Sequence, residues 1–181
     1  MQVYLETECL ILRRLTLEDA DVLYALDNDP EVMRYINAGA PVSYATIREQ
    51  LLPRYLSYYE TGADYGYWAA IEKESGEFIG WFHFRPARDT EEIELGYRLK
   101  RAAWGKGYAT EGSRALVRKG FQELGLPRII AKTLTANQAS RHVMEKLGMR
   151  LVEHFWEERF IGEDKSAVLY ALDREDYRPE A

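Results

Sequence analysis

Apolar and polar residues alternate most regularly over residues 93–99. A period of two places the apolar members on one face of a β-strand: Ile93, Leu95, Tyr97 and Leu99. Two apolar runs precede this segment, at residues 65–72 and 78–84, and a Lys-Glu-Ser-Gly turn separates them. The three runs predict an antiparallel meander.

The spacing of apolar residues changes to that of helices over residues 108–124 and 137–147, with a strand predicted between them at 129–134. The strand at 93–99, the helix at 108–124 and the strand at 129–134 form a strand–helix–strand unit, which implies a parallel crossover. Two further strand-like segments, residues 149–160 and 166–172, form a predicted closing pair.

The first third of the chain predicts one strand and several helices. Residues 10–15 resemble a strand, Thr16 is placed to cap a helix, and Pro30 is placed to open another. A longer helix is expected over residues 44–60, with a kink or break at Pro53. The whole pattern predicts a single domain over residues 1–181 of the α/β (α+β) class, in which a mixed sheet carries helices on both faces.

Composition and charge limit the kinds of substrate and partner that we expect. The formal net charge is −6 and the basic residues are scattered, so the basic stripe of a nucleic-acid-binding protein is absent and a positively charged substrate would be favoured. No run approaches the length of a membrane-spanning helix, and the first residues lack the basic region of a signal peptide. We therefore expect a cytoplasmic protein with no membrane or direct nucleic-acid partner.

The segment Gly105-Lys106-Gly107 joins a predicted strand to a predicted helix. Two glycines allow backbone N–H groups to approach a ligand, and the start of a helix favours an anion, so this loop predicts pyrophosphate binding. It does not match a Walker A loop, because Lys106 is followed by glycine. It does not match the dinucleotide fingerprint either, because Thr110 occupies the third glycine position. A tight turn without a ligand is the alternative.

Together with its neighbours, this loop resembles the GNAT family of acetyltransferases, and most closely the branch that acetylates the N-termini of ribosomal proteins. Six short segments carry the resemblance, in order along nearly the whole chain: residues 5–13, 29–35, Glu94-Leu95-Gly96-Tyr97, residues 104–111, Asn137-x-x-Ser140 and residues 145–149. The chain departs from the family's pattern at Ala102, where a polar residue is common; Arg101 lies one place earlier.

The resemblance implies a GNAT-like twisted sheet of six to seven strands, mostly antiparallel, in which a splayed parallel pair holds CoA. It implies acetyl-CoA as co-substrate. No metal is expected, because no spacing of His, Cys, Asp or Glu residues suggests a metal site. Tyr97 and Leu99 would contact CoA through their backbones. The other implied CoA contacts are Trp104, Gly105, Lys106, Gly107, Tyr108, Ala109, Thr110, Asn137 and Ser140.

Acyl transfer to an amine requires removal of a proton from the amine and stabilisation of the departing thiolate. Glu94 and Glu92 share one face of the predicted strand and are the candidate bases, and the resemblance favours Glu94. It also implies that Ser140 protonates or hydrogen-bonds the thiolate. The three histidines fall in separate predicted elements and are not expected to form a site. An acceptor pocket could draw on aromatic residues, namely Tyr35, Tyr65, Tyr67, Trp81 and Tyr97.

These features predict an N-acetyltransferase that moves an acetyl group from acetyl-CoA to a primary amine by direct attack in a ternary complex. The acceptor is a protein N-terminus or a small molecule, and the chain is a monomer or homodimer. Two alternatives stay open: a CoA-binding sensor or interaction module without catalysis, and an N-acyltransferase that uses another acyl-CoA such as succinyl-CoA.

Overall fold

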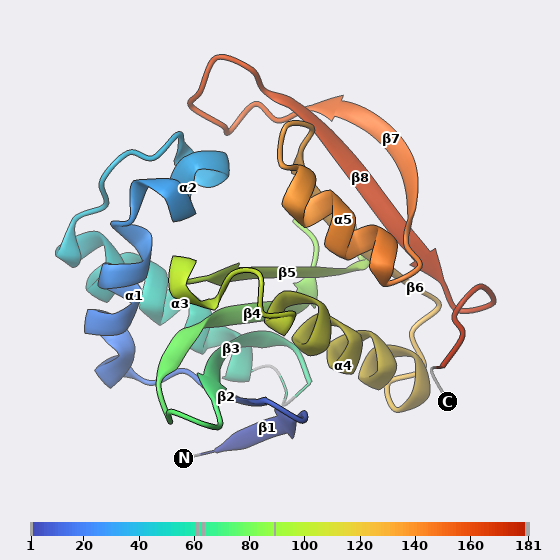
Figure 1. The fold of residues 1–181 in the computed structure, drawn as a ribbon, viewed down its shortest axis with the longest axis horizontal. Coiled ribbons are helices and arrows are strands. Elements are labelled where there is room, and N and C mark those ends of the chain that lie inside the picture. Colours follow the sequence, from blue (N-terminus) through green and yellow to red (C-terminus); the bar gives the residue numbers. More distant parts are fainter. Residues whose placement is uncertain (1, 61, 63, 89, 180–181) are drawn as a thin grey trace.

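The computed structural model describes residues 2–60, 62, 64–88 and 90–179. Within them, eight strands form one sheet in the order β1-β2-β3-β4-β5-β6-β8-β7 (Figure 1). The strands are β1 (Val3–Glu6), β2 (Leu10–Arg14), β3 (Gly66–Glu72), β4 (Phe78–Pro86), β5 (Ile93–Leu99), β6 (Arg128–Leu134), β7 (Arg150–Trp156) and β8 (Ser166–Asp173). All neighbouring pairs are antiparallel except β5 and β6, which confirms the predicted meander and the parallel crossover.

The sheet has more strands than the six to seven expected, because the N-terminal segment folds as a hairpin. The resemblance places one strand over residues 5–13, but the chain turns at Thr7. The Thr7 N–H donates to the carbonyl of Leu10 at 2.9 Å, and the Leu10 N–H donates to the Thr7 hydroxyl at 2.9 Å. These two bonds end β1 and start β2.

Helices cover both faces of the sheet (Figure 1). They are α1 (Ala20–Asp27), α2 (Pro30–Asn37), α3 (Leu52–Ser57), α4 (Tyr108–Gln122) and α5 (Gln138–Lys146). Successive residues of β3 separate the two cores: Trp68 packs in the core that includes α4, whereas Tyr67 packs in the core formed with α1 and α3. No helix in the described part of the chain is long and apolar enough to cross a membrane.

The helix expected over residues 44–60 changes its helical type along its length. A π-helical segment, Thr46–Leu51, passes into α3, and Leu51 and Leu52 at the junction both keep right-handed helical backbone angles. Pro53 lies in the first turn of α3 and has no N–H to donate. The helix therefore continues through Pro53 and does not split there.

Helix α4 approaches the sheet closely at Gly112. A Cβ atom at this position would lie 2.4 Å from Cζ of Phe82 on β4, closer than two carbon atoms can approach. The absence of a side chain at Gly112 therefore lets α4 lie directly against the sheet, with its first turn near the end of β5.

Candidate active site

The parallel strands β5 and β6 separate soon after they meet. Their pairing is limited to Ile93 with Ile129 and Glu94 with Ile130, although β5 continues to Leu99 and β6 to Leu134. The splayed pair expected from the resemblance is therefore present, and it leaves one edge of β5 without a neighbouring strand from Leu95 onward.

The backbone groups at this edge follow from the register with β4. The Lys100 N–H donates to the Ile79 carbonyl, and on the same register Trp81 pairs with Arg98. Hydrogen-bonded pairs alternate with non-hydrogen-bonded pairs in an antiparallel ladder. Tyr97 and Leu99 therefore direct their N–H and C=O groups away from β4 and toward the gap.

One of these backbone groups, the Leu99 carbonyl, already has a hydrogen-bond partner. The Trp104 indole N–H donates to the Leu99 carbonyl at 2.9 Å, so the Leu99 N–H is the group left at that end of the edge. Trp104 as a whole residue is half exposed, at 49%. Trp104 therefore ties the loop to the end of β5 rather than packing in a core.

The loop adopts left-handed backbone angles at both glycines, with φ of 74° at Gly105 and 85° at Gly107. Gly107 is the N-cap of α4, and no side chain of the described residues caps the helix there. The N–H groups of the first turn, Tyr108 to Thr110, have no intrahelical acceptor. The loop and helix start therefore present backbone donors and a positive helix dipole at the surface.

Lys106 does not stand alone beside these donors. Its ammonium lies 3.4 Å from Oε1 of Glu72 on β3, and the Tyr108 hydroxyl donates to the same oxygen at 2.5 Å. The bond to Glu72 raises the pKa of Tyr108 to about 12. Both side chains fix the loop on β3, so the charge expected from Lys106 is shared with a carboxylate.

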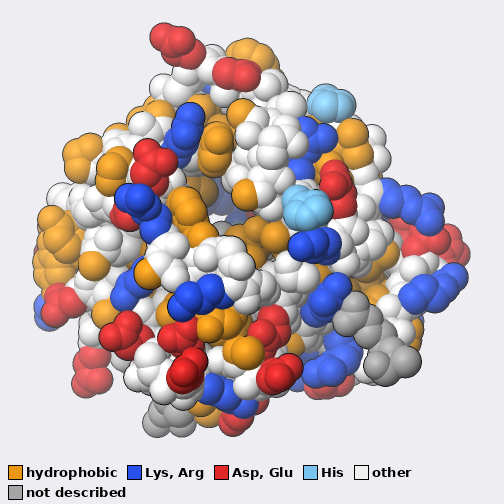
Figure 2. All heavy atoms as spheres, viewed as in Figure 1, with side chains coloured by type: hydrophobic (Ala, Val, Ile, Leu, Met, Phe, Trp, Pro, Cys, Tyr) orange, Lys and Arg blue, Asp and Glu red, His pale blue; other side chains and the backbone are white. Residues whose placement is uncertain are grey.

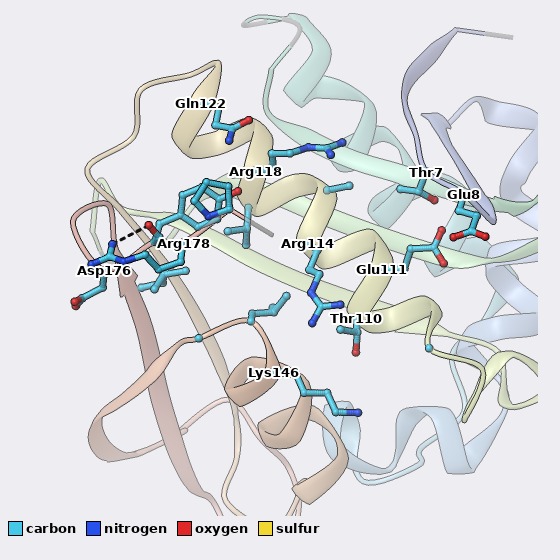
Figure 3. Close-up of a pocket in the computed structure, with 18 residues that line it drawn as sticks. Thr7, Glu8, Thr110, Glu111, Arg114, Arg118, Gln122, Lys146, Asp176 and Arg178 are labelled. Carbon is cyan, nitrogen blue, oxygen red and sulfur yellow. Dashed lines mark hydrogen bonds between the residues drawn. The ribbon is translucent and has the colours of Figure 1, made fainter. Parts of the chain in front are cut away.

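Other cations lie beside the start of α4. A surface pocket of about 1240 Å³ is lined by Gly107 and Thr110 together with Arg114 on α4 and Lys146 on α5. Figure 3 shows Thr110, Arg114 and Lys146 facing the same space. Sequence reasoning missed the two cations, although Arg114 follows Thr110 by one helical turn, the spacing that puts two residues on one helix face.

Ser140 of α5 lies near Tyr97 of β5. The Asn137 carboxamide oxygen accepts from the Ser140 N–H at 3.2 Å, which confirms Asn137 as the N-cap of α5. Burial raises the pKa of Tyr97 to about 12, against an opposing hydrogen bond from the Ser140 side chain. The structure thus brings together two of the predicted site residues, one from β5 and one from α5.

Glu94 lies on the opposite face of β5 and is largely buried, with 15% of its side chain exposed. Its carboxylate oxygens lie 3.6 Å from Nε2 of His83 and 3.7 Å from Nη2 of Arg85. Burial disfavours the ionised form, but His83, Arg85 and Lys132 outweigh it and lower the pKa of Glu94 to about 2. Glu94 is therefore ionised throughout the physiological range.

The three histidines lie in separate elements, β4, α5 and β7, and His83 is the one that lies beside Glu94. Register pairs His83 with Gly96 and Arg85 with Glu94, so two β4 side chains lie beside the carboxylate. A Cβ atom at position 96 would lie 2.5 Å from the His83 ring, so the imidazole packs directly on the Gly96 backbone. Burial lowers the pKa of His83, and the imidazole is neutral at pH 7.

Glu94 also lines a pocket of about 260 Å³. The walls come from α2, the end of β4, β5, β6 and the β7–β8 hairpin, and they include Tyr35, Leu134 and Phe160. In the space-filling view, the molecule is hollowed between α2 and α5, with hydrophobic side chains on the walls and Lys or Arg side chains deeper in (Figure 2).

The other candidates separate into two groups. Glu92 lies just before β5, where it forms an ion pair with Arg128 at 3.1 Å and does not line the pocket. Of the aromatic residues, Tyr35 lines it, whereas Tyr67 and Trp81 are buried beneath it against His83. The structure thus distinguishes Glu94 from Glu92 by position.

The comparisons with known proteins agree with this geometry. The family model described as acetyltransferase (GNAT) domain matches residues 10–150. The FsC-acetyl coenzyme A-N(2)-transacetylase of Aspergillus fumigatus is 34% identical, over 97% of this chain and 78% of that protein.

Solved structures share the fold. A GNAT-family acetyltransferase from Bacillus anthracis is 25% identical with a TM-score of 0.77, over 97% of this chain and 99% of that one. RimL, a ribosomal L7/L12 alpha-N-protein acetyltransferase in complex with coenzyme A, superimposes with a TM-score of 0.80 at 17% identity, over 95% and 98% of the two chains. The chain therefore belongs to the GNAT family of acetyltransferases and is an acyl-CoA-dependent N-acyltransferase.

Proposed function

We propose that this chain transfers an acetyl group from acetyl-CoA to a primary amine, on a protein N-terminus or a small molecule, by direct attack in a ternary complex. The observation that carries the proposal is the gap between β5 and β6, which opens beside an uncapped helix start. A pantetheine arm is an extended chain with amide groups, so it can hydrogen-bond the free edge of β5 as a strand would.

The donor side follows from the loop. The CoA pyrophosphate would accept from the N–H groups between Gly105 and Thr110, and Arg114 and Lys146 would add positive charge around the nucleotide. The pantetheine would then run along Tyr97 and Leu99, toward the point where β5 and β6 meet. Trp104, Tyr108 and Ala109 complete the loop and hold its shape.

The reaction needs a neutral amine. Its nitrogen attacks the thioester carbonyl carbon, the oxygen takes up negative charge, and the C–S bond then breaks to leave an amide and a thiolate. We assign Glu94 to the amine: its carboxylate accepts a hydrogen bond from the attacking nitrogen or from a water and relays the proton to solvent. A pKa of about 2 makes Glu94 a fixed acceptor and relay that stores no proton.

The leaving group is assigned to Ser140 and Tyr97. The Ser140 hydroxyl on α5 lies close enough to the Tyr97 phenol on β5 to oppose the rise in its pKa, and we place the sulfur beside this pair. The thiolate takes a proton from this pair, and solvent restores it. A free N–H at the edge of β5 would donate a hydrogen bond to the carbonyl oxygen and stabilise its negative charge.

The test is turnover. Thiol release from acetyl-CoA would be followed with a panel of amines and N-terminal peptides, and the acetylated amine would be identified by mass. Glu94→Gln is expected to lower kcat/KM by about 100-fold, within the range seen for general bases. Glu92→Gln, the matched change two residues away, is expected to have little effect.

Two outcomes would replace the proposal. Acetyl-CoA binding with no thiol release across the panel, unchanged by Glu94→Gln, would identify a binding module. Faster release from succinyl-CoA than from acetyl-CoA with the same amines would identify a different acyl donor.

A further inference from the structure

We infer that the amine acceptor carries an anionic group of its own, a carboxylate or a phosphate, and that the basic lining of the pocket around Glu94 binds it. This inference rests on the proposed function, because it names the class of acceptor for the same site. It is carried by the charges that meet in this pocket and by their depth.

The lining is basic in an acidic protein. Four basic side chains and two carboxylates line the pocket, an excess of two positive charges: Arg85, Arg88, Lys132 and Arg159 against Glu94 and Glu157. The whole chain carries a net charge of −6. The overall charge suggests a cationic substrate, but the local charge at the pocket has the opposite sign, and charges close to a bound ligand act on it more strongly than distant ones.

Basic side chains lie both deep in the pocket and at its rim. Glu94 is largely buried, and Arg85 is held beside it by bonds from Nε to the Tyr67 hydroxyl at 3.0 Å and from Nη1 to the Pro86 carbonyl at 2.8 Å. Arg88 is exposed and therefore lies at the rim. Glu94 is the deep carboxylate and Arg88 is the exposed cation, so a ligand with an amine at one end and an anion at the other can place the amine at Glu94 and the anion at the rim.

Lys132 extends the basic surface between these two levels. It projects from β6, its ammonium lies 5.8 Å from the centre of the Phe155 ring, and its charge is felt at Glu94. Tyr35 and Ile36 of α2 and Phe160 supply the apolar part of the wall. The volume of about 260 Å³ is just below the roughly 300–1,000 Å³ of ordinary ligand pockets, which suits a small amino acid-like compound or the first residues of a peptide.

The phosphates of CoA are not the anion in question. The loop residues Gly107 and Thr110 line the other pocket, and the two pockets have no lining residue in common. A carboxylate could also arrive on the acyl group, as in succinyl-CoA. The exposed position of Arg88 favours the acceptor, because the acyl carbon must lie in the gap beside β5 while the rim faces solvent.

The experiment compares acceptors that differ only in charge. Linear amines of increasing length that end in a carboxylate would each be compared with their own carboxamide, and phosphoethanolamine with ethanolamine. Peptides with Asp, Asn or Lys at the second position form the macromolecular arm. In the preferred size class, the anionic member is expected to exceed its neutral counterpart in kcat/KM by about tenfold or more, the effect of one charge-assisted hydrogen bond.

Substitutions in the pocket test whether its basic residues cause the preference for anionic acceptors. Arg88→Gln and Lys132→Gln are expected to raise KM more for the anionic acceptor than for its carboxamide, and Arg88→Glu is expected to shift the preference toward cationic acceptors. Arg48→Gln, the same change of charge at an exposed position outside the pocket, is the matched control and should leave the preference as it is.

Three results overturn the inference in distinguishable ways. Turnover with equal or faster rates for neutral or cationic acceptors refutes the anionic class and leaves acetyl transfer intact. A preference for succinyl-CoA with neutral amines, abolished by Arg88→Gln, moves the anion to the donor. No acetyl-CoA binding and no thiol release with any acceptor refutes the proposed function, and the inference with it.

Discussion

Oε1 of Glu94 lies 3.6 Å from Nε2 of His83, a buried imidazole neither of whose nitrogens has a hydrogen-bond partner among the described residues. The carboxylate is held ionised and the imidazole is held neutral, although the two side chains are in contact. The stability of the fold at acid pH therefore depends on His83 and on the candidate base, Glu94.

The first prediction concerns stability against pH. The pKa of His83 is lowered from 6.5 in the fold, so the unfolded chain takes up a proton first and stability falls as the pH drops below about 6.5. Glu94 contributes stability above about 4.5, which is lost as the pH falls toward 2. Urea unfolding at pH 7 and pH 5 should show a smaller loss for His83→Gln than for the unchanged chain. Equal losses would contradict the neutral imidazole.

A second prediction concerns the pH dependence of turnover. Because Glu94 is ionised from acid pH upward, kcat/KM should rise with pH only as the ammonium group of the acceptor loses its proton. For an α-amine the rise should level off at about pH 8, and for a lysine-type amine it should continue toward about pH 10. Initial rates from pH 5 to 10 measure this. An inflection near pH 5 that disappears in Glu94→Gln would show that the pKa of Glu94 is not lowered.

A third prediction concerns the hydroxyl pair. Ser140→Ala and Tyr97→Phe are each expected to lower kcat by about tenfold or more, and the double variant should lose less than the product of the two, because the groups act together. The Ser140 N–H, rather than its hydroxyl, bonds Asn137, so Ser140→Ala should keep the helix cap and the melting temperature.

A change of leaving thiol distinguishes a role of the hydroxyl pair in thiolate departure from a purely structural role. An acetyl thioester of a more acidic thiol needs less help in departing, so the deficit of Ser140→Ala should narrow with it. An undiminished deficit would place the hydroxyl pair outside the departure step.

A fourth prediction concerns the ion pair that joins α1 to β5. Nη1 of Arg98 lies 2.5 Å from Oδ1 of Asp27, and both side chains are nearly buried. Asp27→Asn leaves a buried charge uncompensated and should lower the free energy of unfolding by about 3–5 kcal/mol. Glu123→Gln, which breaks the more exposed pair with Lys119, should cost less than about 1 kcal/mol. Urea denaturation followed by circular dichroism compares them, and similar losses would contradict the account.

Local patterns predicted the elements better than they predicted the site. Alternation over residues 93–99 identified β5 and its two faces, and Gly105 and Gly107 identified the turn into α4. The sequence did not predict that His83 lies beside Glu94, because this placement depends on the register of β4 against β5. That register is a pairing between strands that neither segment carries on its own.

The same limit applies to the pocket around Glu94. Its cations come from β4, the β4–β5 connection, β6 and the β7–β8 hairpin, and in composition they are only scattered basic residues. For Lys106 the sequence predicted a role that the fold changes. Its position in the loop predicts an anion ligand, but Glu72 of β3 shares its charge through the fold.

The central claim is that acetyl-CoA enters the gap between β5 and β6 and delivers its acetyl group to an amine beside Glu94. A crystal structure of the chain with CoA tests it most directly. We expect the pyrophosphate on the N–H groups of residues 105–110, the pantetheine along Tyr97 and Leu99, and the sulfur beside Ser140. CoA bound elsewhere, with the loop empty and the gap filled by side chains, would contradict the account.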